Sequence, residues 1–266
     1  MKKVLLCCVS LVLLFALVGC QAGFLRPDAS IPNPTAAIQL DYTDDNGVQK
    51  QVTLNFELFY DKAPISVLNF VKLANDKFYD GLILDSSSGL GNGYTTAMQY
   101  IGGGKYRQSE ANSSQFVNVQ EEKKINYTIK GEFEANGWTG AKDLVNQVGS
   151  LCMNRNAGTG QFDSASTEFY VSLNGATSRN GNYAIFGLLK SSSAKSRLPE
   201  QSDWTEFESV NGFYDWFLSD VLALTSVSRK TEDNKSISIP SVVMKIISVT
   251  VDTNGKTLPN PPTISK

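Results

Sequence analysis

The chain of 266 residues has no histidine, only four cysteines and no cluster of basic residues. Histidine and cysteine are the ligands that most transition metals prefer in proteins, so we expect no such metal site, and no other cofactor is predicted. The formal net charge is −2. Without a basic patch, the sequence lacks the electrostatic footprint of a protein that binds nucleic acid.

The N-terminus has the pattern of an export signal. Lys2 and Lys3 precede an apolar run over residues 4–18, and residues 17–20 read Leu-Val-Gly-Cys. A run of about 15 residues fits a cleaved signal better than a membrane span, which needs about 20. Residues 17–20 resemble a bacterial lipobox, which implies cleavage before Cys20 and lipid on its sulfur. The alternative is an uncleaved signal anchor.

Cleavage at this point would leave few cysteines in the mature chain. The two cysteines of the signal would be lost and Cys20 would be acylated, so Cys152 would remain alone, and its apolar neighbours predict a small buried core residue. We expect a signal peptide at residues 1–19 and a lipidated tether at residues 20–35. The protein is thus expected on a bacterial membrane, with its domain facing the periplasm or the cell exterior.

Local patterns predict the first elements of the folded part. Residues 36–41 and 52–59 alternate apolar and polar side chains, as strands do, and residues 44–47 (Asp-Asp-Asn-Gly) are typical of a turn between them. A helix is expected to begin at Pro64, where a missing N–H is harmless. Apolar residues at i, i+3, i+4 and i+7 from Val67 give that helix one buried face.

The rest of the chain alternates between polar stretches and apolar segments. Polar stretches expected to be insertions or surface excursions occupy residues 85–97, 107–124 and 191–209. A helix-like segment with one apolar face follows at residues 213–222, and closing strands are expected at residues 237–240 and 242–251.

Five short motifs occur in order along the chain. They are residues 78–81 (Phe-Tyr-Asp-Gly), 129–133 (Ile-Lys-Gly-Glu-Phe), 148–153 (Val-Gly-Ser-Leu-Cys-Met), 163–171 (Asp-Ser-Ala-Ser-Thr-Glu-Phe-Tyr-Val) and 181–187 (Gly-Asn-Tyr-Ala-Ile-Phe-Gly). This series resembles the cyclophilin-type peptidyl-prolyl cis-trans isomerases, as a divergent bacterial lipoprotein member. The resemblance covers residues 36–252 and leaves a tail at residues 253–266. It implies a mainly β fold, a closed antiparallel eight-stranded barrel capped by two helices, with loop insertions.

The resemblance breaks where the family carries its catalytic arginine. After Tyr-Asp-Gly the family continues with Phe-His-Arg, whereas residues 82–88 read Leu-Ile-Leu-Asp-Ser-Ser-Ser. Proline isomerisation needs no nucleophile and no metal, because its barrier of about 18–20 kcal/mol comes from amide resonance. It needs an apolar pocket for the proline ring and a donor near the proline nitrogen. The catalytic residue is therefore unknown. Arg155, on the groove side of the resemblance, and Arg107, after the Gly-rich turn, are the candidates.

The resemblance also implies which residues would contact a polypeptide. Tyr170 takes the place of a phenylalanine that forms an aromatic wall of the proline pocket, and Glu168 replaces the family's glutamine. Tyr183 stands where eukaryotic members have a histidine. The full set expected to bind substrate is Met98, Gln99, Asn154, Arg155, Glu168, Tyr170 and Tyr183.

Two functions remain open. The chain is either a surface-anchored isomerase that assists the folding of exported proteins at Xaa-Pro bonds, or a cyclophilin-like module with weak or no catalysis that binds Pro-containing segments of partner proteins. The fold-wide resemblance implies the first function. The missing arginine, the missing glutamine and the enlarged loop at residues 85–97 favour the second. Expected partners are Pro-containing polypeptide segments and, through the lipid on Cys20, a membrane.

Overall fold

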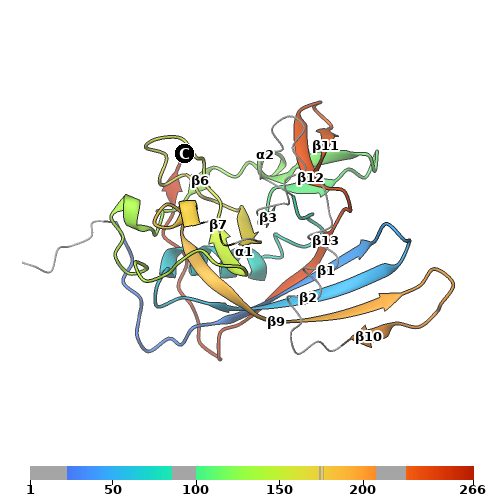
Figure 1. The fold of residues 1–266 in the computed structure, drawn as a ribbon. Helices are drawn as coiled ribbons and strands as arrows, with labels where there is room; N and C mark the ends of the chain where they lie inside the picture. Colours follow the sequence, from blue (N-terminus) through green and yellow to red (C-terminus); the bar gives the residue numbers. More distant parts are fainter. Residues whose placement is uncertain (1–22, 86–99, 174, 176, 208–225) are drawn as a thin grey trace, which may run out of the picture.

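The computed structural model describes residues 23–85, 100–173, 175, 177–207 and 226–266. These residues form a mainly β structure with curled sheets and one helix of three turns (Figure 1). No helix within them is long and apolar enough to cross a membrane.

Several sequence predictions fall on residues outside this description. They are the signal peptide at residues 1–19, the lipid site Cys20, the binding residues Met98 and Gln99, nearly all of the loop at residues 85–97, and the helix-like segment at residues 213–222.

Eight antiparallel strands form the larger sheet, in the order β13-β1-β2-β9-β7-β8-β3, with β10 on the free part of β9. Their bounds are β1 Thr35–Thr43, β2 Gln49–Leu58, β3 Tyr100–Gly103, β7 Ser150–Met153, β8 Phe169–Ser172, β9 Ile185–Arg197, β10 Thr205–Phe207 and β13 Lys245–Asp252. The three long strands β1, β2 and β9 extend beyond the rest of the sheet (Figure 1).

The hairpin of β1 and β2 confirms the strand pair that the sequence predicted. The two strands pair over their whole length. In the turn, the Asp44 carboxylate accepts hydrogen bonds from the N–H groups of Asn46 and Val48, both at 2.9 Å. Gly47 has a φ of 79°, a conformation that glycine adopts at little cost. The aspartate and the glycine of the sequence pattern therefore each have a distinct role in the turn.

The described strands do not form a continuous closed barrel, so the predicted closure is not shown. The sheet has two ends, β13 and β3. Residues 82–85 contact both of them through isolated bridges. The Leu84 N–H donates to the Met244 carbonyl at 2.9 Å, and Asp85 exchanges two hydrogen bonds of 2.7 Å with Gly102. The stretch that stands in place of Phe-His-Arg thus lies between the two ends of the sheet.

Two smaller sheets complete the fold. Four strands form the first, in the order β12-β11-β5-β4: β4 Tyr106–Gln108, β5 Gln115–Asn118, β11 Ser226–Thr231 and β12 Ser236–Pro240. The stretch at residues 107–124 therefore contains strands and the short helix α2 (Val119–Glu122). The predicted closing strand at residues 237–240 belongs to this sheet, whereas β13 pairs with β1. The second consists of β6 Tyr127–Thr128 and β14 Ile264–Ser265.

Helix α1 (Pro64–Asn75) begins where the sequence predicts, but its N-terminus has no cap from its own segment. The Glu132 carboxylate, far along the chain, accepts hydrogen bonds from the N–H groups of Ile65 and Ser66, both at 2.8 Å, and from Ser66 Oγ at 2.7 Å. These are donors that every helix start leaves unpaired. A carboxylate there is also favoured by the helix dipole.

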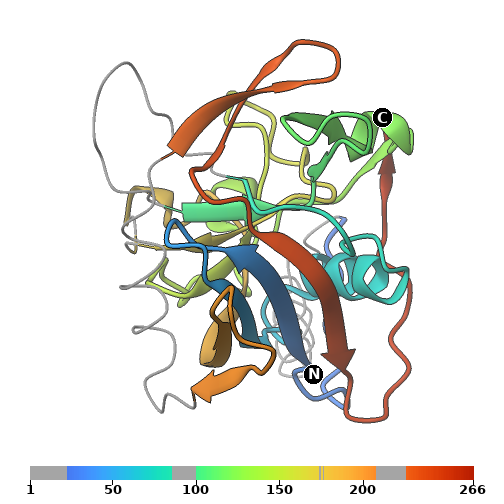
Figure 2. The same cartoon turned by 90° about the vertical axis from the view of Figure 1, so that its right-hand side faces the viewer.

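The helix is buried more completely than one apolar face would require. Ten of its twelve residues are buried, because it packs against β13 and β9 from the concave side of the larger sheet (Figure 2). The Phe70 ring contacts the rings of Tyr79, Phe169 and Phe186 at centroid distances of 5.3, 5.6 and 5.3 Å. Aromatic packing of this kind fixes the helix to β8 and β9.

The stretch expected as an insertion at residues 191–209 extends the sheet in its described part. β9 continues to Arg197 and pairs with β2 as far as Gln49. β10 then folds back on β9. Between them, the Trp204 ring lies within 5.1 Å of Lys195 Nζ and 4.9 Å of the Arg197 guanidinium carbon.

Residues 24–34 run along the surface of the domain. The Phe24 ring stacks on Trp138 with 4.9 Å between centroids, and Lys130 Nζ lies 5.0 Å from the Phe24 ring. Leu25 and Ile31 pack against the main core. These contacts hold the segment against the folded body.

Candidate functional site

The strands β7 and β8 separate two groups of apolar side chains, because successive residues of a strand point to opposite sides. Those on the inner side belong to the main core: Leu151, Met153, Phe169 and Val171. Those on the outer side form a second cluster with residues of β3 and β9: Tyr100, Cys152, Tyr170 and Ile185. Cys152 is fully buried, as predicted, and burial raises the pKa of its thiol to about 12.

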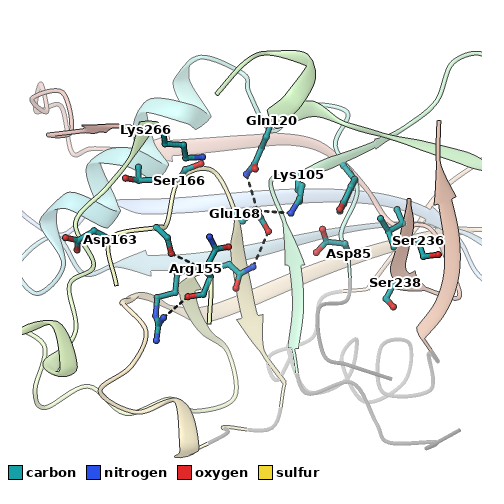
Figure 3. Close-up of a pocket in the computed structure, with 16 residues that line it drawn as sticks. Asp85, Lys105, Gln120, Arg155, Asp163, Ser166, Glu168, Ser236, Ser238 and Lys266 are labelled. Atoms are coloured by element: carbon teal, nitrogen blue, oxygen red, sulfur yellow. Dashed lines mark hydrogen bonds and ion pairs between the residues drawn. The ribbon is translucent and has the colours of Figure 1, made fainter. Parts of the chain in front are cut away.

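A cleft of about 680 Å³ opens where β7 ends and β8 begins (Figure 3). Its lining is polar and comes from several elements, among them β6, β12 and the chain after β3. It brings together three residues that the sequence assigns to substrate binding, Asn154, Arg155 and Glu168. Asp85 lines the same cleft.

Glu168, which replaces the family's glutamine, is the centre of the polar contacts in the cleft. Its carboxylate accepts hydrogen bonds from Gln120 Nε2 at 3.2 Å and from Asn154 Nδ2 at 3.1 Å. Lys105 Nζ lies 3.3 Å from its Oε1. Three donors from three segments fix the orientation of this carboxylate, and the lysine balances its charge.

Asp85 differs from Glu168, although it lies in the same cleft. It is 9% exposed, and no residue in the described part of the chain donates a hydrogen bond to its carboxyl oxygens. Burial, reinforced by the charge of Glu168 and opposed by Lys105, raises its pKa from 3.8 to about 7. The carboxyl group lies against Gly102, where an added Cβ would come within 2.9 Å of Oδ1. Glycine at this position makes room for it.

An arginine that the sequence reasoning did not consider lies on the outer cluster. Arg179 ends the short 3₁₀ turn η2 (Thr177–Arg179) between β8 and β9. Its guanidinium carbon lies 3.9 Å from the ring centroid of Tyr100, 4.9 Å from that of Tyr170 and 5.1 Å from that of Tyr183. These three rings are the aromatic lining of the site, and Arg179 covers them.

The ring expected to form the wall of a proline pocket is fully buried. Tyr170 has no exposed surface, and its hydroxyl oxygen has no hydrogen-bond partner among the described residues. Burial raises the pKa of this phenol well above its ordinary value, so it stays neutral. Tyr183 packs edge-on against it at 5.8 Å. Both predicted tyrosines are thus in one cluster, outside the polar cleft.

The two arginines that the sequence offered as substitute donors have other partners. The Arg155 guanidinium donates to the carbonyls of Asn182 at 2.8 Å and Asn156 at 2.7 Å, and it lies 4.7 Å from the Tyr183 ring. Arg107 lies on β4 in the second sheet, in an ion pair of 2.7 Å with Glu122.

A local signal for Arg179 exists, although it is weak. Residues 178–182 read Ser-Arg-Asn-Gly-Asn, which is the composition of a surface turn. An arginine in such a turn is expected to be exposed. Only the pairing of β3 with β8 places Tyr100 beside Tyr170 and so creates the aromatic surface that Arg179 covers. In the described residues, no group of three or more Cys, Asp or Glu side chains has the arrangement of a metal site.

Comparisons with known proteins point to one family. A family model described as "Cyclophilin type peptidyl-prolyl cis-trans isomerase/CLD" matches residues 44–195. No curated protein matches the chain. Similar solved structures include two of a Cryptosporidium parvum cyclophilin type peptidyl-prolyl cis-trans isomerase, one of them in the presence of the dipeptide Ala-Pro. They are 16% and 15% identical, with TM-scores of 0.45 and 0.44, and the alignments cover 81% and 82% of this chain and 99% of theirs.

Proposed function

The chain belongs to the cyclophilin-type peptidyl-prolyl cis-trans isomerase family, and we propose that it binds Pro-containing segments of exported proteins and accelerates isomerisation of their Xaa-Pro bonds. The observation that carries this proposal is the family match over residues 44–195. That range contains β3, β7, β8 and η2, and hence the tyrosine cluster and most of the polar cleft, whose remaining lining comes from β12 and Lys266.

The geometry suggests how a polypeptide would lie on this surface. The cleft offers amide and carboxylate groups for hydrogen bonds to a peptide backbone, from Asn154, Gln120 and Glu168. The tyrosine cluster next to it offers the partly exposed ring of Tyr183 as an apolar surface for a proline ring. We further propose that residues 82–85, through their bridges to β13 and β3, complete the eight-stranded barrel.

The chemistry requires little from the protein. Xaa-Pro isomers differ by only about 0.5–1 kcal/mol, so the equilibrium is nearly balanced and a catalyst needs to lower the barrier alone. Binding the twisted amide more tightly than the planar one achieves this. No nucleophile, metal or cofactor takes part in such a mechanism.

The activity can be tested with protein that begins at Gln21 and therefore lacks the lipid site. Cis–trans exchange of the peptide Ala-Ala-Pro-Phe is followed by NMR exchange spectroscopy with and without protein. We expect an exchange rate that rises in proportion to protein concentration. An unchanged rate at peptide-saturating protein would contradict the isomerase proposal.

The alternative function, binding without catalysis, is favoured by one specific observation. Tyr100 and Tyr170 are 7% and 0% exposed, and Arg179 lies over both rings, so these rings form no open apolar recess for a proline ring. In that case the peptide would shift the protein's NMR signals, but its isomerisation would not be accelerated.

We also propose that the protein is exported and anchored by lipid on Cys20, with the domain facing the periplasm or the cell exterior. The support is the sequence of residues 1–20 alone. Metabolic labelling with a radioactive fatty acid should mark the protein, and Cys20→Ser should abolish the label. A label that persists in Cys20→Ser would place the lipid elsewhere.

A further inference from the structure

Arg179 lies over the tyrosine cluster, and the proposed function gives it no role. We propose that Arg179 hydrogen-bonds the Xaa-Pro peptide group of the bound segment, a role that the sequence reasoning offered to Arg155. This inference rests on the proposed function, because it assumes that the segment binds over the tyrosine cluster.

The contacts of Arg179 leave its donors available. Its guanidinium carbon is only 3.9 Å from the Tyr100 centroid, a distance at which a planar guanidinium lies with its face on the ring. The five N–H donors of arginine lie in the plane of the group. The hydroxyls of Tyr100 and Tyr170 can each take one of these donors, which still leaves N–H donors at the edge for another acceptor.

No carboxylate neutralises this cation. Within the described residues, Arg179 takes part in no ion pair, whereas Arg107 is paired with Glu122. Arg155 uses two of its donors on main-chain carbonyls. A half-buried guanidinium without a carboxylate partner is unusual, because charges that leave water are normally paired. An acceptor supplied by a ligand would complete its contacts.

The neighbouring groups favour a neutral acceptor over an anionic one. Tyr170 is buried with its hydroxyl unpaired, and the thiol of Cys152 beside it is kept neutral by burial. The partly exposed ring of Tyr183, 5.1 Å from the guanidinium carbon, offers apolar area beside the cation. A proline, with its compact apolar ring next to an amide, matches this combination of apolar surface and donor.

A donor at this place would act on the barrier itself. As the Xaa-Pro bond twists, amide resonance is lost and the lone pair returns to the proline nitrogen, which becomes a hydrogen-bond acceptor. An N–H of Arg179 directed at this nitrogen would stabilise the twisted state more than the planar one. No covalent bond forms or breaks. Removing one such preorganised donor typically lowers kcat by about 10²–10³-fold.

The test compares arginine variants in the Gln21–Lys266 protein, again with Ala-Ala-Pro-Phe. Arg179→Ala is expected to lower kcat/KM by about 10²-fold or more, mainly through kcat. Arg179→Lys keeps a charge but not the planar fork, so it should recover only part of the rate. Arg155→Ala should lower the rate less than tenfold. Arg229→Ala, on the exposed β11 of the second sheet, should leave the rate unchanged.

A second measurement does not depend on any variant folding well. The Nε–H signal of Arg179 in the unaltered protein, assigned by its loss in the Arg179→Lys spectrum, should shift when Ala-Ala-Pro-Phe is added. The control peptide Ala-Ala-Ala-Phe should move it much less. Arg179→Ala is interpreted only if its amide spectrum shows that it is folded.

The outcomes separate this inference from the proposed function. If the protein accelerates isomerisation and Arg179→Ala retains or exceeds the unaltered rate, Arg179 is not the donor, although the isomerase function stands. An Arg179 signal that shifts with the peptide while isomerisation is not accelerated supports the contact and contradicts the isomerase function. If the Arg179 signal does not respond to the proline peptide at saturation, the inference is wrong.

Discussion

Glu132 and Asp85 are both carboxyl residues in the interior, and in both burial raises the pKa to about 7. Their surroundings differ. Glu132 accepts three hydrogen bonds at the N-terminus of α1, whereas Asp85 faces the cleft with no hydrogen-bond donor among the described residues. The first carboxyl has the partners of a structural group. The second lines the cleft, and burial without such partners raises its pKa.

The largest effect expected from these two buried carboxyl groups is on the pH dependence of stability. Both groups bind a proton more tightly in the folded state, so their stabilisation is complete below their unfolded pKa of about 4 and is lost as pH rises through about 7. At about 1.4 kcal/mol per pKa unit, each could contribute at most roughly 3 to 5 kcal/mol. Urea unfolding at pH 5, 6, 7 and 8 should show the free energy of unfolding falling steadily.

The composition makes this pH window unusually clear. The chain has no histidine to titrate between pH 5 and 8. The carboxyls with lowered pKa, such as Asp44 with its turn hydrogen bonds and Glu57 beside Lys190, lose their stabilisation only at lower pH. A flat profile from pH 5 to 8 would show that neither buried carboxyl has a raised pKa.

Glu132→Gln should have the next largest effect. The amide keeps one acceptor but turns an NH₂ group towards a buried N–H of Ile65 or Ser66, which leaves that donor without a partner. Such a loss costs about 1–3 kcal/mol in the free energy of unfolding, measured by urea unfolding at pH 7. Glu134→Gln, at an exposed position two residues on, is the matched control and should change it by less than about 0.5 kcal/mol. If the two variants changed the free energy of unfolding equally, Glu132 would have no special structural role.

Asp85→Asn should have the smallest effect on stability and the opposite sign. The amide cannot ionise, so at pH 8 the variant should be more stable than the unaltered protein by about 1–2 kcal/mol, and at about pH 3.5, below the unfolded pKa, the difference should vanish. The measurement is urea unfolding at both values. Destabilisation at pH 8 would mean that the Asp85 carboxylate has a stabilising partner in the folded state. The comparison with Glu132 would then fail.

Elements defined by local patterns were predictable from the sequence. The Asp-Asp-Asn-Gly turn and the alternation of residues 36–41 and 52–59 gave the β1–β2 hairpin, and Pro64 marked the start of α1. The motifs gave the family. What the local patterns could not show was the cap of α1, because Glu132 lies more than sixty residues from the helix that it completes.

The candidate site was predictable only in part, for the same reason. Asn154 and Glu168 meet in one cleft, as the motif alignment implied, although their role in binding stays a prediction. The position of Arg179 could not be predicted from local sequence, because the rings around it come from three separate segments. The barrel closure and the structure of residues 107–124 were not predictable from local patterns either. Both depend on strand pairing between segments that lie far apart in the sequence.

The stacking of Phe24 on Trp138 has a consequence for the proposed lipid anchor, because it would limit the distance between the domain and a bilayer. If lipid is attached at Cys20, only three residues lie between the anchor and a ring that is packed on the domain, which is four steps along the chain. An extended chain advances about 3.5 Å per residue, so this spacer reaches no more than about 14 Å. The surface around Trp138 would then face the lipid headgroups at close range, and clients would have to approach the protein from its sides or from its far end.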